Sequence, residues 1–128
     1  MKLLLDTQLL LWAAYTPERL SPAARAMIED LGNELAFSPA SLWEVVIKRA
    51  LGRPDFRVDP RLLRRGLVEN GYIELAVTSD HALAVDMLPH FHKDPFDCLL
   101  VAQALAEGLS FVSADTQLAA YPGDIRLV

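Results

Sequence analysis

The chain has 128 residues, of which 52% are hydrophobic, which suits one domain with a buried core and argues against intrinsic disorder. Its 12 Lys and Arg against 17 Asp and Glu give a formal net charge of −5, and this sign by itself disfavours a polyanionic partner. The single cysteine, Cys98, excludes an internal disulfide framework, and the longest apolar run, residues 9–15, is shorter than the roughly 20 residues of a membrane-spanning helix. We therefore expect a single domain over residues 1–128, located in the cytoplasm.

Short apolar runs alternate with segments that carry helix start and stop residues. The expected order is a strand at 3–5, helices at 7–14 and 22–31, a strand at 35–38, helices at 39–51 and 60–70, a strand at 72–77, helices at 79–88 and 95–106, a strand at 109–113, a short helix at 116–120 and a strand at 125–128. A proline at the first position and a glycine beyond the end mark four of these helices: Pro22 and Gly32, Pro39 and Gly52, Pro60 and Gly71, Pro95 and Gly108. Apolar strands separated by helices predict a central parallel sheet covered on both faces, which is a three-layer α/β/α domain.

Acidic side chains come close behind several predicted strands. Asp6 follows the first strand, Asp115 follows the strand at 109–113, and Glu44 lies in the first turns of the helix after the strand at 35–38. Asp97 lies in the first turn of the helix that Asp94-Pro95 opens. In open parallel sheets, ligands bind outside the carboxyl ends of the strands, so we expect these carboxylates to share one edge of the sheet.

Each carboxylate also has a purely structural interpretation. Asp6, Asp94 and Asp115 are suitable N-caps, and Asp97 is favourable in a first helical turn. The segment from Ser41 to Glu44 matches a capping box, although the apolar neighbours of Glu44 make a solvent-facing acid less expected there.

Together, the carboxylates are harder to explain as caps. Ionised carboxylates within a few ångströms repel one another, so a fold that gathers them needs a cation between them. Oxygen ligands without a cysteine cluster suit Mg²⁺ or Mn²⁺ rather than zinc. Such a metal can activate water and stabilise the leaving oxygen of a phosphodiester, so the set predicts metal-assisted phosphodiester hydrolysis.

The chain resembles PIN-domain nucleases, and among them the VapC-type toxins of bacterial toxin–antitoxin pairs. Four motifs in family order carry the resemblance, which runs nearly end to end: Leu3-Leu4-Leu5-Asp6-Thr7, Ser41-Leu42-Trp43-Glu44, His92-Lys93-Asp94-Pro95-Phe96-Asp97 with residues 99–104, and Ser113-Ala114-Asp115. The resemblance implies a PIN-like α/β/α fold, Mg²⁺- or Mn²⁺-dependent endoribonuclease activity on RNA, a homodimer, and inhibition by a small VapB-like antitoxin. The family's acidic quartet falls on Asp6, Glu44, Asp97 and Asp115.

Position suggests a role for each member of this quartet. We expect Asp6, Asp97 and Asp115 to bind the metal and Glu44 to orient or deprotonate the attacking water. Candidate hydrogen-bond supports, each also explicable as a cap or turn residue, are Thr7, Ser38, Ser113 and Thr116. His92 and Lys93 are candidates for contact with a phosphate, or simply part of a solvated loop.

One departure from the family pattern opens an alternative. Cys98 stands where this branch often has Arg, so a catalytically weakened PIN-like binding module that acts through its partner is the second hypothesis. A phosphoacceptor receiver domain is disfavoured, because Thr7 rather than a second acid follows Asp6 and no lysine occurs beyond Lys93.

Two further features bear on partners. Residues 48–65 contain seven basic residues against two acids, which is either a solvated helical face or an arm that holds the RNA backbone. Trp12, Tyr15 and Trp43 are candidates to line an antitoxin groove, with core packing as the alternative.

Overall fold

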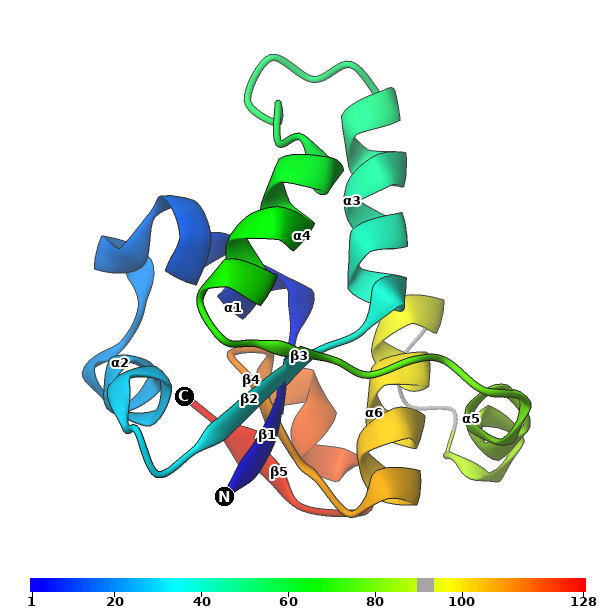
Figure 1. The fold of residues 1–128 in the computed structure, drawn as a ribbon. Helices are drawn as coiled ribbons and strands as arrows, with labels where there is room; N and C mark the ends of the chain where they lie inside the picture. The colour runs from blue at the N-terminus through cyan, green and yellow to red at the C-terminus, as the bar shows by residue number, and fades with distance from the viewer. Residues whose placement is uncertain (90–93) are drawn as a thin grey trace.

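The computed structural model describes residues 1–89 and 94–128, and five parallel strands form one sheet in this part of the chain (Figure 1). Their order in the sheet is β3-β2-β1-β4-β5. The strands are β1 (Lys2–Leu5), β2 (Glu34–Phe37), β3 (Ile73–Glu74), β4 (Ser110–Ser113) and β5 (Ile125–Leu127). In the centre of the sheet, Leu4 of β1 is in register with Ala36 of β2 and Phe111 of β4.

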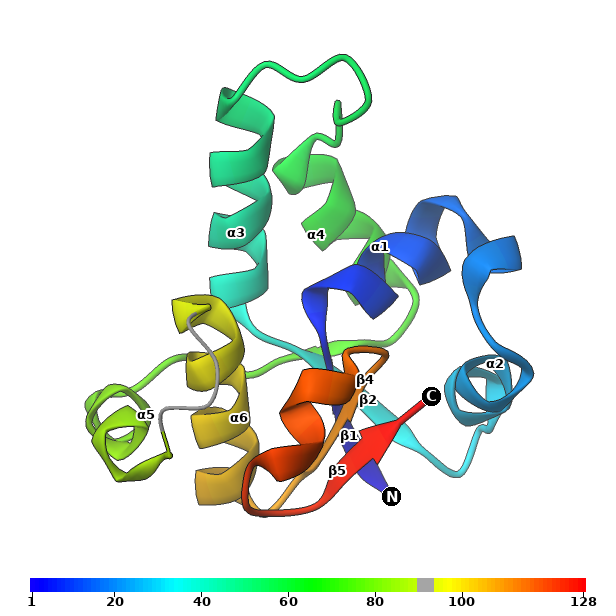
Figure 2. The ribbon, with the colours of Figure 1, turned by 180° about the vertical axis from the view of Figure 1, so that it is seen from behind.

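Helices cover both faces of this sheet. They are α1 (Thr7–Tyr15), α2 (Pro22–Glu29), α3 (Pro39–Ala50), α4 (Pro60–Glu69), α5 (Ser79–Ala84) and α6 (Pro95–Glu107), with 3₁₀ turns η1 (Pro17–Arg19), η2 (Val85–Met87) and η3 (Thr116–Ala120). Figures 1 and 2 show α1, α2 and α4 on one side and α5 and α6 on the other. The predicted three-layer α/β/α architecture is confirmed.

Two apolar cores form because successive side chains of each strand point to opposite faces. Leu3 and Leu5 of β1 pack with residues of α1 and α4, including Leu9, Leu10 and Leu63. On the other face, the core joins β1 and β4 to α6 and η3, through Leu4, Phe111, Leu100, Val101 and Leu118. The central strands β1 and β4 are therefore buried over nearly their whole length, as expected for parallel strands covered on both sides.

Most helices begin and end at the capping residues, prolines and glycines that the sequence shows. Ser21, Ser38, Asp59 and Asp94 cap helices that begin with proline. At the other end of α6, Gly108 has φ +68, a left-handed conformation that closes the helix. Among the described residues, no helix is both long and apolar enough to cross a membrane.

Three predicted boundaries are wrong. The strand expected at 72–77 is reduced to Ile73–Glu74, because its partner β2 gives way at Pro39 to α3 and leaves later residues no ladder to join. The helix expected at 79–88 is α-helical only to Ala84, is capped by Thr78, and continues as the 3₁₀ turn η2. The second helix ends at Glu29, short of Gly32.

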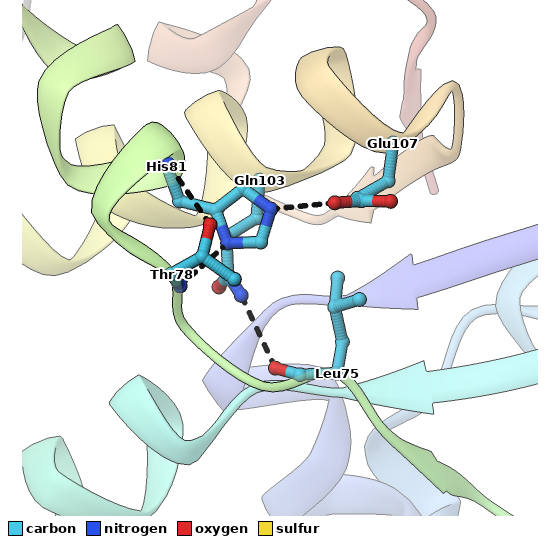
Figure 3. A network of polar contacts seen from close by, with 5 residues as sticks. All are labelled: Leu75, Thr78, His81, Gln103 and Glu107. Atoms are coloured by element: carbon cyan, nitrogen blue, oxygen red, sulfur yellow. Dashed lines mark hydrogen bonds and ion pairs between the residues drawn. The ribbon is translucent and has the colours of Figure 1, made fainter.

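A polar network fastens α5 to α6 (Figure 3). The imidazole of His81 is buried, and its Nδ1 accepts a hydrogen bond from the backbone N–H of Thr78 at 3.0 Å. Nδ1 therefore carries no proton, and Nε2–H donates to Glu107 Oε1 at 2.7 Å. Beside it, buried Gln103 of α6 donates from Nε2 to the carbonyl of Leu75 at 3.2 Å. The contacts join α5 and the segment after β3 to the carboxyl-terminal half of α6.

Candidate active site

The four predicted carboxylates line one pocket of about 280 Å³. Asp6, Glu44, Asp97 and Asp115 come from four separated segments that meet beside the carboxyl ends of β1 and β4, where α1, α3 and α6 begin (Figure 2). The remaining lining residues are Gln8, Trp12, Lys48, Asp94 and Ala114. The structure thus brings together the whole set that the sequence predicts.

Local structure explains how each acid reaches this pocket. Asp6 is the residue between β1 and α1, and Asp115 is the N-cap of η3, where its Oδ1 accepts from Gln117 N at 3.0 Å. Asp94 is the N-cap of α6 and accepts from Phe96 N at 2.9 Å, which leaves Asp97 in the first turn. The capping interpretation is therefore correct for Asp94 and Asp115, yet both also face the pocket.

Asp6 is held in an environment that disfavours its charge. It is 7% exposed, and burial raises the pKa of its carboxyl above the ordinary aspartate value, while a hydrogen bond from Ser113 partly opposes this shift. The negative charges of Glu44 and Asp115 raise the pKa of Asp6 further. Placing three acids within electrostatic reach of one another is unfavourable unless a cation is present.

Glu44 presents an oxygen without a protein partner. Its side chain is buried, Oε2 lies 3.3 Å from Lys48 Nζ, and Oε1 has no hydrogen-bond partner in the described part of the chain. The capping-box interpretation of Ser41 and Glu44 is wrong, because Ser38 caps α3 and places both residues inside the helix. Glu44 is thus a buried acid with unused hydrogen-bonding capacity at the pocket.

Hydrogen bonds of serine and threonine hydroxyls fix the segments around the carboxylates. Ser113 Oγ donates to Asp6 Oδ2 at 2.6 Å and accepts from Asp115 N at 3.0 Å, so one hydroxyl positions two of the acids. Thr7 Oγ1 donates to Ser41 Oγ at 2.8 Å, which ties the start of α1 to α3. Ser38 acts as a cap, accepting from Ala40 N at 3.1 Å.

Sequence reasoning missed three residues of this pocket. Gln8 and Trp12 are four residues apart on α1, and Glu44 and Lys48 are four residues apart on α3, so each pair shares a helix face. A spacing of four residues from Glu44 finds Lys48, whereas Gln8 and Trp12 lie two and six residues after Asp6 and no helical spacing from that acid marks them. Trp12 Nε1 is buried and, like Glu44 Oε1, has no hydrogen-bond partner among residues 1–89 and 94–128.

The remaining candidates lie elsewhere or are more exposed than core packing would require. Trp43 is 60% exposed and packs edge-on against Phe96 with ring centroids 5.2 Å apart, and Tyr15 is 49% exposed. Cys98 is half-buried, with Sγ 3.4 Å from Tyr121 Oη. His92 and Lys93 lie outside the described residues.

The donor set fits a hard divalent cation in chemistry. Carboxylate oxygens are the ligands that Mg²⁺ and Mn²⁺ prefer, and Glu44 Oε1 is a buried acceptor that nothing in the described chain satisfies. Within residues 1–89 and 94–128, however, no three His, Cys, Asp or Glu side chains converge closely enough to hold a metal together.

Comparison with known proteins places this geometry in a family. The fold matches one chain of VapBC2 from Rickettsia felis, solved bound to a DNA fragment from its promoter, with TM-score 0.71, 14% identity, and coverage of 100% of this chain and 98% of that one. It also matches the toxin–antitoxin structure VapBC-5 from Mycobacterium tuberculosis, with TM-score 0.66, 19% identity and coverage of 99% and 98%. DNA-bound VapBC from Salmonella typhimurium gives TM-score 0.65, 15% identity and coverage of 100% and 97%.

These identities are low, so the structural matches establish the fold alone. A comparison with curated protein sequences gives no significant match. The sequence itself matches the PIN domain family over residues 3–124, which is nearly the whole chain. The chain belongs to the PIN domain family.

Proposed function

We propose that this protein is a metal-dependent endoribonuclease that hydrolyses RNA phosphodiester bonds and serves as the toxin of a toxin–antitoxin pair. The observation that carries the proposal is the pocket in which Asp6, Glu44, Asp97 and Asp115 meet from four segments. PIN domains are typically metal-dependent nucleases, and the similar folds of VapBC complexes support the toxin assignment.

Asp6, Asp97 and Asp115 would hold the metal, with Mg²⁺ or Mn²⁺ as the suitable ion. When bound, the ion supplies charge that activates water and stabilises the leaving oxygen of the phosphodiester. Ser113 keeps the carboxylate of Asp6 oriented through its 2.6 Å hydrogen bond and holds the backbone of Asp115. This arrangement restricts the motion of two ligands before any ion arrives.

Glu44 would orient the attacking water and accept its proton. Lys48 holds Oε2 at 3.3 Å, so Oε1 is the oxygen that remains for the water. The buried position of Glu44 restricts competing bulk water, which favours transfer of the proton to this carboxylate.

The resemblance also supports partners and a place of action. A VapB-like antitoxin would neutralise the protein, a second copy of the chain would form a homodimer with it, and RNA in the cytoplasm would be its substrate. The complexes from Rickettsia felis and Mycobacterium tuberculosis, described as VapBC assemblies, are the basis for expecting such an antitoxin.

A catalytically weakened binding module is the second candidate. Two observations favour it: Cys98 stands where the VapC-type branch often has Arg, and the described acids do not converge on one point. In this case the protein would bind its antitoxin without cleaving RNA.

RNA cleavage by the purified, antitoxin-free chain separates the two candidates. Asp6→Asn and Asp97→Asn are each expected to abolish Mg²⁺-dependent cleavage, and Glu44→Gln to slow it by about 100-fold or more because a general base is lost. Glu29→Gln, an exposed acid at the end of α2, is the matched control and should cleave like the parent. Undiminished cleavage by Asp6→Asn, or full activity in excess EDTA, would contradict the proposed function. A wild-type chain that binds antitoxin but cleaves no RNA would favour the binding module.

A further inference from the structure

A second pocket of about 300 Å³ adjoins the carboxylate pocket. Gln8 of α1 and Lys48 of α3 line both, so the two pockets lie on either side of these two side chains. Beyond them, the second pocket is lined by Arg19 of η1 and by Arg53 and Phe56 of the segment between α3 and α4. We call it the cationic pocket.

The cationic pocket carries an excess of positive charge. Arg19, Lys48 and Arg53 face a single acid, Asp55, among its lining residues. In the described part of the chain, neither Arg19 nor Arg53 forms an ion pair, whereas Lys48 pairs with Glu44 across the shared wall. Two exposed guanidinium groups therefore stand next to the carboxylates with their charge unneutralised by the protein.

We propose that the cationic pocket binds the phosphodiester next to the scissile one on a single strand of RNA. The proposal rests on the proposed function, because it needs a scissile phosphate over the carboxylates. A polynucleotide carries one charge at each nucleotide, so a strand placed there brings a second phosphate alongside the shared wall. The planar guanidinium forks of Arg19 and Arg53 match phosphate oxygens, and such contacts position a strand without selecting its sequence.

The other basic residues of the stretch 48–65 do not line this pocket. Arg49 pairs with Asp59 at 3.6 Å, and Arg64 pairs with Glu74 at 2.9 Å. Arg61, Arg64 and Arg65 line a separate groove on α4 that shares no lining residue with the carboxylate pocket. Of the seven basic residues in the stretch 48–65, Lys48 and Arg53 are the two that line the cationic pocket.

Binding of a short, labelled single-stranded RNA tests this assignment without cleavage. In an Asp6→Asn background, fluorescence anisotropy is measured over a series of KCl concentrations for Arg19→Gln/Arg53→Gln and for the comparison pair Arg61→Gln/Arg65→Gln. Loss of the contacts to one phosphate of a single strand is expected to weaken binding about 5-fold at 0.1 M salt and to reduce the slope of log K against log salt by about 0.7. The comparison pair, with the same change of charge, should bind as the background does.

Several results would overturn the inference. The first is an unchanged RNA affinity in Arg19→Gln/Arg53→Gln, and the second is an equal loss of affinity in both pairs of variants. The third concerns polyglutamate, a polyanion without phosphate: weaker binding of polyglutamate together with unaffected binding of RNA would contradict a phosphate site. RNA cleavage is measured separately, with Arg19→Gln/Arg53→Gln made in the chain that retains Asp6. This second measurement tests the proposed nuclease independently of the cationic pocket. If cleavage is normal and the Arg19 and Arg53 substitutions change neither cleavage nor RNA binding, the result supports the nuclease and contradicts the proposed role of the cationic pocket. RNA binding that depends on the two arginines without any cleavage supports the pocket and contradicts the nuclease.

Discussion

Asp6 shows at the scale of one residue how a candidate site opposes folding. Burial raises the pKa of its carboxyl, and Glu44 and Asp115 add to the shift. A carboxyl with a pKa raised on folding contributes most to stability at acidic pH, where it is protonated, and that contribution is lost as the pH rises through the folded-state pKa. Above its folded-state pKa and without metal, Asp6 is therefore a destabilising charge.

We predict that Asp6→Asn raises the Tm of the metal-free protein. In EDTA at neutral pH, the neutral amide removes the buried charge, and each kcal/mol recovered should raise Tm by about 4 °C in a chain of this size. The difference between variant and parent should shrink towards pH 4 and grow as the pH rises, as followed by thermal melts. Adding Mg²⁺ should stabilise the parent more than the variant, because only the parent retains the full ligand set.

Glu29→Gln is again the control, since this exposed acid has no place in the pocket. A lower Tm for Asp6→Asn in EDTA would show that the hydrogen bond from Ser113 outweighs the burial of charge.

The attachment of α5 to α6 is the feature that matters most at the scale of elements. Helix α6 carries Asp97 in its first turn and Glu107 at its end, and Glu107 receives the hydrogen bond from His81 shown in Figure 3. His81 also closes the amino end of α5 through a reciprocal capping box with Thr78. A single buried side chain therefore both caps one helix and joins it to the next.

We expect His81→Ala to destabilise the fold by about 2 kcal/mol, because it leaves the Thr78 N–H without its partner and opens a cavity. Thermal unfolding should show this as a Tm lower by roughly 8 °C. Leu83→Ala, on the same helix at a position 72% exposed, should change stability by less than about 0.5 kcal/mol. Equal effects of the two substitutions would mean that the network contributes nothing beyond ordinary helix packing.

At the scale of the whole molecule, opposite charges are sorted into neighbouring pockets. The net charge of −5 averages the carboxylate pocket with the cationic pocket, so it does not exclude a polyanionic ligand. One side of α3 also exposes Trp43, Val46 and Ile47, at 60%, 47% and 39%. Their spacing of three and four residues makes this a continuous apolar strip, of the kind that contact with another chain would bury.

We predict that this strip belongs to the proposed homodimer. Sedimentation should give the parent twice the mass of its 14.2 kDa chain, and Ile47→Glu should return it to a monomer by placing a charge in the contact. Leu83→Glu adds the same charge at an exposed position on α5 and should leave the dimer intact. A parent that sediments as a monomer, or a dimer that survives Ile47→Glu, would contradict this.

Much of the fold could be predicted because its signals are local. Proline at helix starts, glycine at helix ends and apolar strands predict the order of elements, and that order places Asp6, Glu44, Asp97 and Asp115 near one edge of the sheet. One error arose where the length of a strand depends on the neighbouring strand. Strand β3 is short because β2 ends at Phe37, and the sequence of residues 72–77 does not encode where β2 ends.

The sequence by itself therefore determined the α/β/α class and predicted the four acids that line one pocket, since both depend on residue type and spacing along the chain. Only the tertiary structure decided which distant groups meet: Ser113 beside Asp6, Lys48 and Gln8 on the wall between two pockets, and Arg19 brought next to Arg53. It also separated the arginines of α4 from the carboxylates, although all lie in one basic stretch. The physical reason is that packing of helices onto the sheet sets these distances, and no local pattern encodes them.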